Sequence, residues 1–276
     1  MMQTVSVDLK PISEAGGALV GGVDLRAEQT GEVKEILKAA LFENGFLLFR
    51  DQELSPEQQI AAGRIFGTIS TQGENYKNTD GVRYVSNVAA DGVNPVGELT
   101  FHVDHSFYPS PLRAIMLYAI DVPPPGAGGE TMLANARLAY KLLPGELRAR
   151  IEGTKALHVY DFAYSRDKVG DRIRDVDCGP LAPRAIHPVV MEHPVTGEKI
   201  LYISRRHVDR IFGYPEAESE ALIDELLPYI YRSNIIYTHA WLPGDLLVFD
   251  NLALQHARTN FSPQHKRHMR RVQVAA

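Results

Sequence analysis

The first 70 residues contain short apolar runs and amphipathic stretches, separated by turn residues. From Glu32 onward the apolar positions recur every three or four residues, which indicates a helix, and Gly45 ends it. Ser55 precedes Pro56 and is followed three positions later by Gln58, a pattern typical of a capped helix start. We therefore expect strands over 5–8, 17–24 and 46–49, and helices from 32 and from 55.

Beyond residue 80 the chain changes to runs rich in β-branched and aromatic residues, which are typical of strands. Such runs cover 82–88, 114–121, 131–134, 186–192, 199–204, 235–240, 246–250 and 268–275. Helical patterns interrupt them over 135–152 and 215–233. Because strands predominate without a regular βα alternation, the pattern favours a mainly β fold with helices, built on a core of two packed sheets. We see no repeat and no linker, so we expect one domain over 1–276.

Residues 161–185 are rich in charged side chains and poor in apolar ones. A loop of this length in a compact domain is usually a functional lid or a disordered segment. The sequence leaves both interpretations open.

Charge and cysteine content exclude some classes of protein. The net charge is −5 and the pI is near 6.1, which argues against a nucleic-acid groove. No apolar run reaches the roughly 18 residues of a membrane span, and the N-terminus lacks the pattern of a secretory signal. Cys178 is the only cysteine, so no intrachain disulfide can form. We therefore expect a cytoplasmic protein whose partners are small molecules, and a homo-oligomer stays open.

His102 and Asp104 form the first candidate site, together with the distant His256. Two imidazoles and one carboxylate make up the facial triad that holds non-haem Fe(II) and leaves positions open for oxygen chemistry. His102 lies in an apolar, strand-like stretch, and residues i and i+2 of a strand point to the same face. Both side chains can therefore reach one cation.

A second His-x-Asp pair, His207 and Asp209, competes with the first. Its neighbours are Arg205, Arg206 and Arg210, and three guanidiniums disfavour a bound cation on Coulombic grounds. We interpret His207 and Asp209 as surface or ion-pair residues, and a place at the substrate entrance stays open.

Two further segments offer groups that bind anions. Gly128–Leu133 is a small-residue turn that leads into a strand, where the Thr131 hydroxyl can face a cavity. Near the C-terminus, strand alternation sends Arg267 and Arg271 to one face. Buried arginines need anions, and a guanidinium fits a carboxylate. The alternative is a solvated basic tail.

Together these motifs resemble the taurine dioxygenase family of Fe(II)- and 2-oxoglutarate-dependent oxygenases. The resemblance covers nearly all of the chain. It includes the segments GFLLFRDQEL (45–54), FHVDHSF (101–107), GGETML (128–133) and GDLLVFDNLALQH (244–256). The implied fold is a double-stranded β-helix, a jelly-roll core braced by α-helices.

The resemblance also implies roles for individual residues. His102, Asp104 and His256 are expected to bind Fe(II), and Thr131 and Arg267 to hold the distal carboxylate of the co-substrate 2-oxoglutarate. Arg271 falls where family members bind the anionic group of their substrate.

Glu98 departs from the family pattern, because taurine-type enzymes place a substrate-binding asparagine at about this position. A carboxylate there repels a sulfonate and favours a substrate with a positive group. We therefore expect Glu98 to contact a small anionic or zwitterionic metabolite other than taurine.

The implied reaction consumes 2-oxoglutarate and O2, releases succinate and CO2, and oxidises a C–H bond of the substrate. Asp104 is the ligand that related halogenases lack, so hydroxylation is favoured over halogenation. Desaturation, epimerisation and cyclisation use the same iron chemistry and stay open. A non-catalytic jelly-roll that binds a small molecule is the alternative from another class.

Overall fold

The computed structural model describes residues 7–72, 81–93, 96–162 and 172–276. Its first strands are β1 (Asp8–Ser13), β2 (Gly16–Gly21), β3 (Phe46–Phe49), β4 (Val82–Ser86), β5 (Leu99–His102), β6 (Leu112–Asp121), β7 (Thr131–Asn135) and β8 (Lys155–Val159). They are followed by β9 (Arg184–Pro188), β10 (Val190–Glu192), β11 (Lys199–Leu201), β12 (Val208–Ile211), β13 (Ile236–His239), β14 (Leu246–Asp250), β15 (Leu254–Arg258) and β16 (His268–Ala275). The helices are α1 (Gly31–Asn44), α2 (Pro56–Gly63), α3 (Ala136–Leu142), α4 (Gly145–Ile151) and α5 (Glu216–Ile230), with 3₁₀ turns η3 (Asp175–Asp177) and η4 (Ser233–Ile235).

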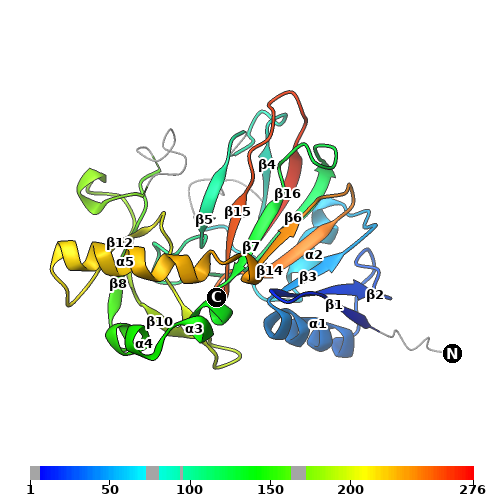
Figure 1. The fold of residues 1–276 in the computed structure, drawn as a ribbon. Helices are drawn as coiled ribbons and strands as arrows, with labels where there is room; N and C mark the ends of the chain where they lie inside the picture. The colour runs from blue at the N-terminus through cyan, green and yellow to red at the C-terminus, as the bar shows by residue number, and fades with distance from the viewer. Residues whose placement is uncertain (1–6, 73–80, 94–95, 163–171) are drawn as a thin grey trace.

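Two sheets form the centre of the fold (Figure 1). The larger has the strand order β1-β2-β3-β14-β6-β16-β4, and the smaller has the order β13-β7-β15-β5. Their facing sides meet in one hydrophobic cluster, to which the larger sheet contributes Phe46, Ile115 and Phe249 and the smaller sheet Leu133 and Leu254. The chain thus forms the expected two-sheet core.

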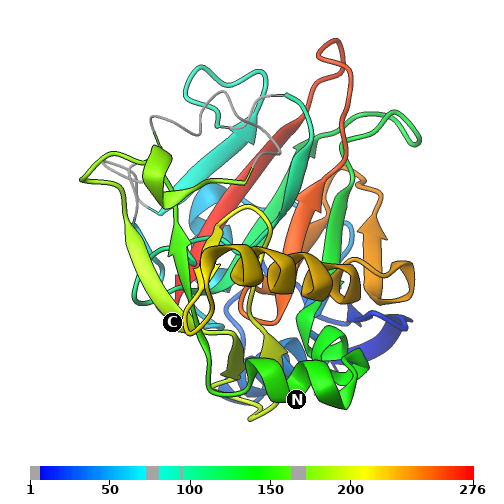
Figure 2. The ribbon, with the colours of Figure 1, turned by 60° about the vertical axis from the view of Figure 1, so that its left-hand side comes forward.

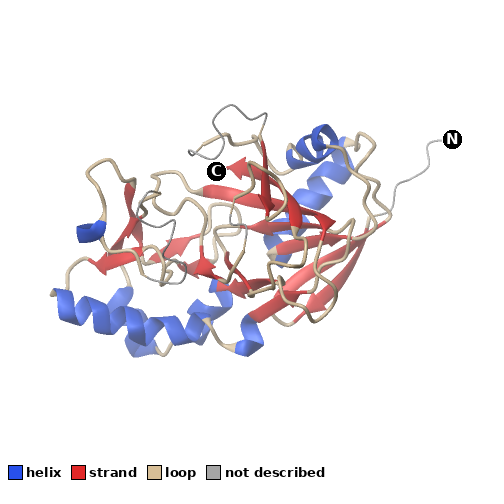
Figure 3. Cartoon of the chain, turned by 90° about the horizontal axis from the view of Figure 1, so that it is seen from above, coloured by secondary structure: helices blue, strands red, loops and turns tan. Residues whose placement is uncertain are grey.

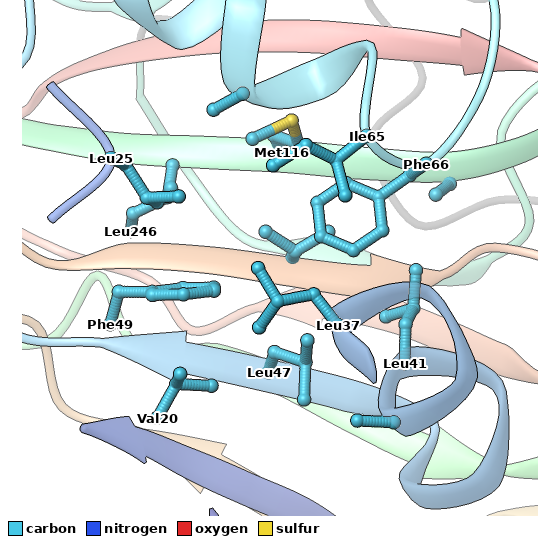
Figure 4. Packing of buried hydrophobic residues seen from close by; sticks show 14 of the residues in the cluster. Val20, Leu25, Leu37, Leu41, Leu47, Phe49, Ile65, Phe66, Met116 and Leu246 are labelled. Atoms are coloured by element: carbon cyan, nitrogen blue, oxygen red, sulfur yellow. The ribbon is translucent and has the colours of Figure 1, made fainter. Parts of the chain in front are cut away.

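Strand alternation explains why β3 and residues 246–249 of β14 are apolar. Phe46 and Leu48 face the smaller sheet, whereas Leu47 and Phe49 belong to the cluster on the other face. There they meet α1 and α2, which cover the outer face of the larger sheet through residues such as Leu37 (Figure 4). A strand that is buried on both faces is apolar over a continuous run of residues, and such runs predicted both strands.

A second group of helices lies on the other side of the strands. α3, α4 and α5 share a hydrophobic cluster with β8 and β12, two strands of a smaller sheet of order β12-β8-β9. α5 crosses in front of the strands in Figure 2, and from above the helices lie at two outer sides with the strands between them (Figure 3). Among the described residues, no helix has both the length and the apolar character needed to cross a membrane.

The helix predicted over 135–152 is two helices, and the prediction of one was wrong. Leu143 is extended (φ −65°, ψ 137°) and separates α3 from α4. The reason is Pro144, whose ring disfavours helical backbone in the residue before it. The strand predicted over 186–192 divides into β9 and β10 after Pro188.

Other differences concern short or polar strands. The first strand begins at Asp8 rather than at residue 5, and residues 5–6 lie outside the described part. β8, β12 and β15 were not predicted as strands, because their polar residues hide the strand pattern.

Of the loop 161–185, residues 163–171 lie outside the described part, and ion pairs hold the remainder, among them Arg174–Asp209 (3.0 Å) and Arg184–Asp175 (2.5 Å). Whether the loop is a lid stays open.

The packing of α1 on the larger sheet gives a stability prediction. Leu37 is fully buried there, whereas its neighbour Ile36 is 37% exposed. We expect Leu37→Ala to lower the free energy of unfolding by about 2–5 kcal/mol, because it leaves a cavity. Ile36→Ala, the matched control in the same helix, is expected to cost less than about 1 kcal/mol. Urea unfolding followed by circular dichroism measures both, and equal losses would contradict the assigned packing.

Candidate metal centre

The pairing of β5 with β15 brings His102 and His256 together, although 154 positions separate them in the chain. The two residues are direct partners in the antiparallel register, and their rings lie 4.2 Å apart, centroid to centroid. Figure 1 shows the two strands side by side. Directly opposite residues of an antiparallel pair project to the same face, so both imidazoles point to one place.

Asp104 completes the group from a turn, not from the strand as we had expected. β5 ends at His102, and the side chain of Asn251 holds the backbone of Asp104 by accepting from its N–H (3.0 Å) and donating to its carbonyl (2.9 Å). Asp104 Oδ1 lies 3.3 Å from His102 Nε2 and 3.8 Å from His256 Nε2. One ligand atom from each of the three residues lies within 4.8 Å of the other two.

The donor set fits a ferrous ion. His102 Nδ1 lies 2.7 Å from the Thr100 carbonyl oxygen, which assigns the proton to Nδ1 and leaves the Nε2 lone pair facing Asp104 and His256. Burial, opposed in part by the charge of Asp104, lowers the pKa of His256 to about 3 and keeps that imidazole neutral. Burial by itself would raise the pKa of Asp104. The His102 hydrogen bond, the nearby His256 and the charge of Arg271 outweigh it and hold this pKa well below its usual range. Two imidazoles and one carboxylate are the ligands of a facial triad.

Two cavities meet at this triad, and both are lined by His102 and Arg271. The first, which we call the arginine cavity, is also lined by Thr131, Arg258 and Arg267. The second, the aromatic cavity, is also lined by His105, Phe107, Tyr160, Phe162, Arg206 and His207. Another cleft, of about 340 Å³ between residues 25–29 and α2, contains no triad residue.

Arg267 is buried and faces the arginine cavity, so the solvated basic tail is excluded for this residue. Its Nε donates to the Gly129 carbonyl (3.1 Å), and a Cβ on Gly129 would lie 3.3 Å from Arg267 Cδ. The glycine turn thus permits the close approach of the guanidinium. Burial lowers the pKa of Arg267 to about 9, which identifies a cation whose environment favours an added anion.

Thr131 faces the same cavity from β7, as predicted. Its hydroxyl oxygen accepts a hydrogen bond from Trp241 Nε1 (3.1 Å). Sequence reasoning missed Trp241, and it also missed Arg258, which lies directly opposite Thr131 on β15. The Arg258 side chain donates to the carbonyl groups of Val96 and Gly97, just before β5. Arg258 follows His256 by two positions on β15, and this spacing could have indicated that both side chains point to the same face.

Arg271 reaches the triad itself, since its Nη1 lies 3.2 Å from Asp104 Oδ2. It therefore stands where the two cavities meet. Glu98, by contrast, is exposed and lines neither cavity. Its contact with a substrate stays a prediction.

The second His-x-Asp pair is buried, and its interpretation as surface was wrong. His207 is 2% exposed, stands edge-on to His102 with ring centroids 5.7 Å apart, and lines the aromatic cavity. Asp209 forms the expected ion pairs, with Arg174 (3.0 Å) and Arg210 (3.2 Å). The flanking arginines suggested exposure to solvent. The burial arises because β12 lies against β8 and α5.

Comparison with known proteins settles the family. The model of the family "Taurine catabolism dioxygenase TauD, TfdA family" matches residues 8–273. The chain belongs to this family. It is 34% identical to an (S)-phenoxypropionate/alpha-ketoglutarate-dioxygenase of Sphingobium herbicidovorans, over 97% of this chain and 94% of that protein. It is 32% identical to the alpha-ketoglutarate-dependent 2,4-dichlorophenoxyacetate dioxygenase of Cupriavidus pinatubonensis, over 98% and 97%.

Solved structures agree with this membership. The crystal structure of AAD-2 in complex with Mn(II) and N-oxalylglycine superposes with a TM-score of 0.84 at 28% identity, covering 98% of this chain and 97% of AAD-2. The jelly-roll prediction is confirmed. This TauD, TfdA family member is an alpha-ketoglutarate-dependent dioxygenase that uses Fe(II), 2-oxoglutarate (another name for alpha-ketoglutarate) and O2. The non-catalytic binding protein is thereby set aside.

The triad geometry predicts which residue decides metal affinity. We expect Asp104→Ala to weaken Mn(II) binding more than about 100-fold, because loss of an outer partner of a ligand alone costs 10- to 100-fold. His265→Gln, which removes an imidazole outside the triad, is the control and should bind as the parent does. Electron paramagnetic resonance titration of free Mn(II) measures both. Unchanged affinity in Asp104→Ala would contradict the triad.

Proposed function

We propose that His102, Asp104 and His256 hold Fe(II), and that Thr131 and Arg267 bind 2-oxoglutarate in the arginine cavity. We further propose that Arg271 binds the anionic group of a small substrate in the aromatic cavity. The observation that carries the proposal is the meeting of both cavities at the triad. A co-substrate and a substrate can then approach one metal ion from different sides.

The arginine cavity suits the co-substrate. The guanidinium of Arg267 and the hydroxyl of Thr131 offer donors to a carboxylate at one end, and His102 and His256 line the same cavity at the metal. 2-Oxoglutarate has a carboxylate at one end and a keto acid at the other. Arg267 thus orients the keto acid toward the triad, and the apolar side chains of Ile115 and Leu117 exclude water along the way.

When bound, the iron couples the oxidative decarboxylation of 2-oxoglutarate to the oxidation of a C–H bond. The reaction balances, since one oxygen atom of O2 enters succinate, the other enters the hydroxylated product, and C1 of 2-oxoglutarate leaves as CO2. The residues of the chain contribute position, charge and exclusion of water. Arg271 holds the substrate anion next to Asp104, so the carbon that reacts is one near the anionic group.

The walls of the aromatic cavity favour a substrate with a flat apolar body. Phe107 stacks on Tyr160 with ring centroids 4.9 Å apart, and Phe162 stands edge-on to Phe107 at 5.9 Å. Aromatic walls of this kind bind planar groups through stacked and edge-to-face contacts. Two of the relatives are named for phenoxypropionate and 2,4-dichlorophenoxyacetate, which combine a ring with a carboxylate. We propose a small carboxylate with a ring for this enzyme as well.

Three further points are proposals. We propose one domain over 1–276, because the family model spans residues 8–273. A cytoplasmic location accords with a single cysteine and ferrous iron. The homo-oligomer stays a prediction.

The anaerobic enzyme tests the metal and the co-substrate together. Addition of Fe(II) and 2-oxoglutarate should produce a weak visible charge-transfer band, and air with an accepted substrate should then release succinate. Absence of both the band and succinate across a panel of aryl and aryloxy carboxylates would refute the proposal. The product mass separates a gain of one oxygen from a loss of two hydrogens.

Arg271 gives the prediction for the substrate. With the first accepted carboxylate, Arg271→Gln should raise the KM for that substrate on the order of 10- to 100-fold, the range of a hydrogen bond to a charged group. The KM for 2-oxoglutarate should change little. Arg205→Gln, which removes an exposed guanidinium paired with Asp224 (2.7 Å), is the matched control and should leave both KM values unchanged. A larger effect on 2-oxoglutarate than on the substrate would contradict the assignment.

A further inference from the structure

We propose that Trp241 is a positioning residue for the co-substrate, because its indole N–H fixes the direction in which the Thr131 hydroxyl donates. The inference rests on the proposed binding of 2-oxoglutarate by Thr131 and Arg267, and it adds a residue to which no role is assigned.

The hydrogen bond between Trp241 and Thr131 has only one possible direction. An indole N–H can only donate, so in the 3.1 Å contact the Thr131 oxygen is the acceptor. Both side chains are buried, Thr131 at 3% and Trp241 at 5% exposure. The hydroxyl proton of Thr131 must therefore point away from the indole. Since Thr131 lines the arginine cavity and Trp241 does not, the free direction for this proton includes the cavity.

The strand register places the two residues together. Thr131 is the direct partner of His239 in the pairing of β7 with β13, and Trp241 follows two positions after His239. The His239 ring stands edge-on to the indole, with centroids 4.4 Å apart and an interplanar angle of 84°. This contact restricts the tilt of the indole ring behind the cavity wall.

A buried acid fixes the turn that bears Trp241. Asp245 Oδ2 accepts from the backbone N–H of Leu242 (2.8 Å) and lies 3.1 Å from His239 Nε2. Arg50 Nη1 lies 2.5 Å from the same oxygen and balances its charge. Asp245 thus holds two groups next to the Trp241 indole. One is the His239 ring, which packs against the indole, and the other is the turn that begins at Leu242.

The consequence for the co-substrate is electrostatic preorganisation. A hydroxyl without a fixed partner rotates among several directions, and ligand binding must then select one of them. With Trp241 in place, the Thr131 O–H is already available to a carboxylate held by Arg267. The effect concerns affinity for 2-oxoglutarate and not the oxidation step, so it should appear in Kd and KM but not in kcat.

Trp241 is the only tryptophan of the chain, so the tryptophan fluorescence of the enzyme reports on its hydrogen bond to Thr131. Its emission depends on the hydrogen bond of the indole N–H. A carboxylate that accepts from the Thr131 hydroxyl makes its oxygen a better acceptor, because hydrogen bonds in a chain polarise one another. Binding of 2-oxoglutarate should therefore shift the tryptophan emission of the enzyme.

The first experiment measures affinity by calorimetry, with 2-oxoglutarate titrated into the Mn(II)-loaded enzyme. We expect Trp241→Phe, which keeps an aromatic ring, to raise the Kd about two- to tenfold, the range of one net hydrogen bond. The same factor should appear in KM, with kcat unchanged. In a Thr131→Val background the change at Trp241 should have no further effect, because the hydroxyl through which it acts is absent.

Tyr118→Phe is the matched control. It removes another buried aromatic hydrogen bond, from the Tyr118 hydroxyl to the Gln52 carbonyl (2.8 Å), and should leave the Kd for 2-oxoglutarate unchanged. An unchanged Kd in Trp241→Phe, or an equal loss with and without the Thr131 hydroxyl, would overturn the inference. If the parent enzyme with Mn(II) does not bind 2-oxoglutarate at all, it is the proposed function that fails.

The second experiment needs no substitution of the tryptophan. At saturating 2-oxoglutarate, the emission shift should occur in the parent and in Thr131→Ser, which keeps the hydroxyl, and it should disappear in Thr131→Val. A shift of equal size in Thr131→Val would show that the indole responds by another route, and the inference would fall.

Discussion

The antiparallel pairing of β5 with β15 is the constraint on which the site depends. It makes His102 and His256 direct neighbours, and every other functional group is placed relative to them. β15 in turn pairs with β7, whose first residue is Thr131, and β7 pairs with β13, which leads to Trp241. One hydrogen-bonded sheet therefore places the two candidate histidine ligands and the Thr131 hydroxyl, and it leads to the Trp241 indole. A shift of β15 by one residue would turn His256 to the opposite face and separate the triad.

The two-sheet core supports this arrangement at the expense of stability. Arg267 and Arg270 are buried on β16, as is Arg258 on β15, and burial lowers the pKa of all three. A buried guanidinium is unfavourable unless carbonyls or anions surround it. Arg270 donates to the Gln59 side chain and to the Leu54 carbonyl, so its role is structural. Within the described part of the chain, the Arg267 guanidinium donates only through its Nε, to the Gly129 carbonyl. The difference separates a cation that completes the fold from one directed at a ligand.

Sequence patterns predicted the mostly apolar strands β3 and β14 and missed the more polar β15. β3 and β14 were evident because both of their faces are buried, against helices on one side and the second sheet on the other. β15 was missed, since Gln255, His256 and Arg258 interrupt any apolar alternation. Its polar residues serve the site and not the core. The burial of His207 was missed in a similar way, because its arginine neighbours in the sequence suggested exposure to solvent.

The sequence by itself determined the chemistry, because the set of two histidines and one aspartate, with the Gly128–Leu133 turn and the C-terminal arginines, is specific for this family. Tertiary structure alone decided the relations between these groups. That Asp104 leaves the strand and is held by Asn251, that Glu98 points to solvent and that Trp241 stands behind Thr131 are facts of long-range packing. Each joins residues more than 100 positions apart or depends on which face of a turn is covered. Local propensity holds no information on such contacts, since they form only when distant strands pair.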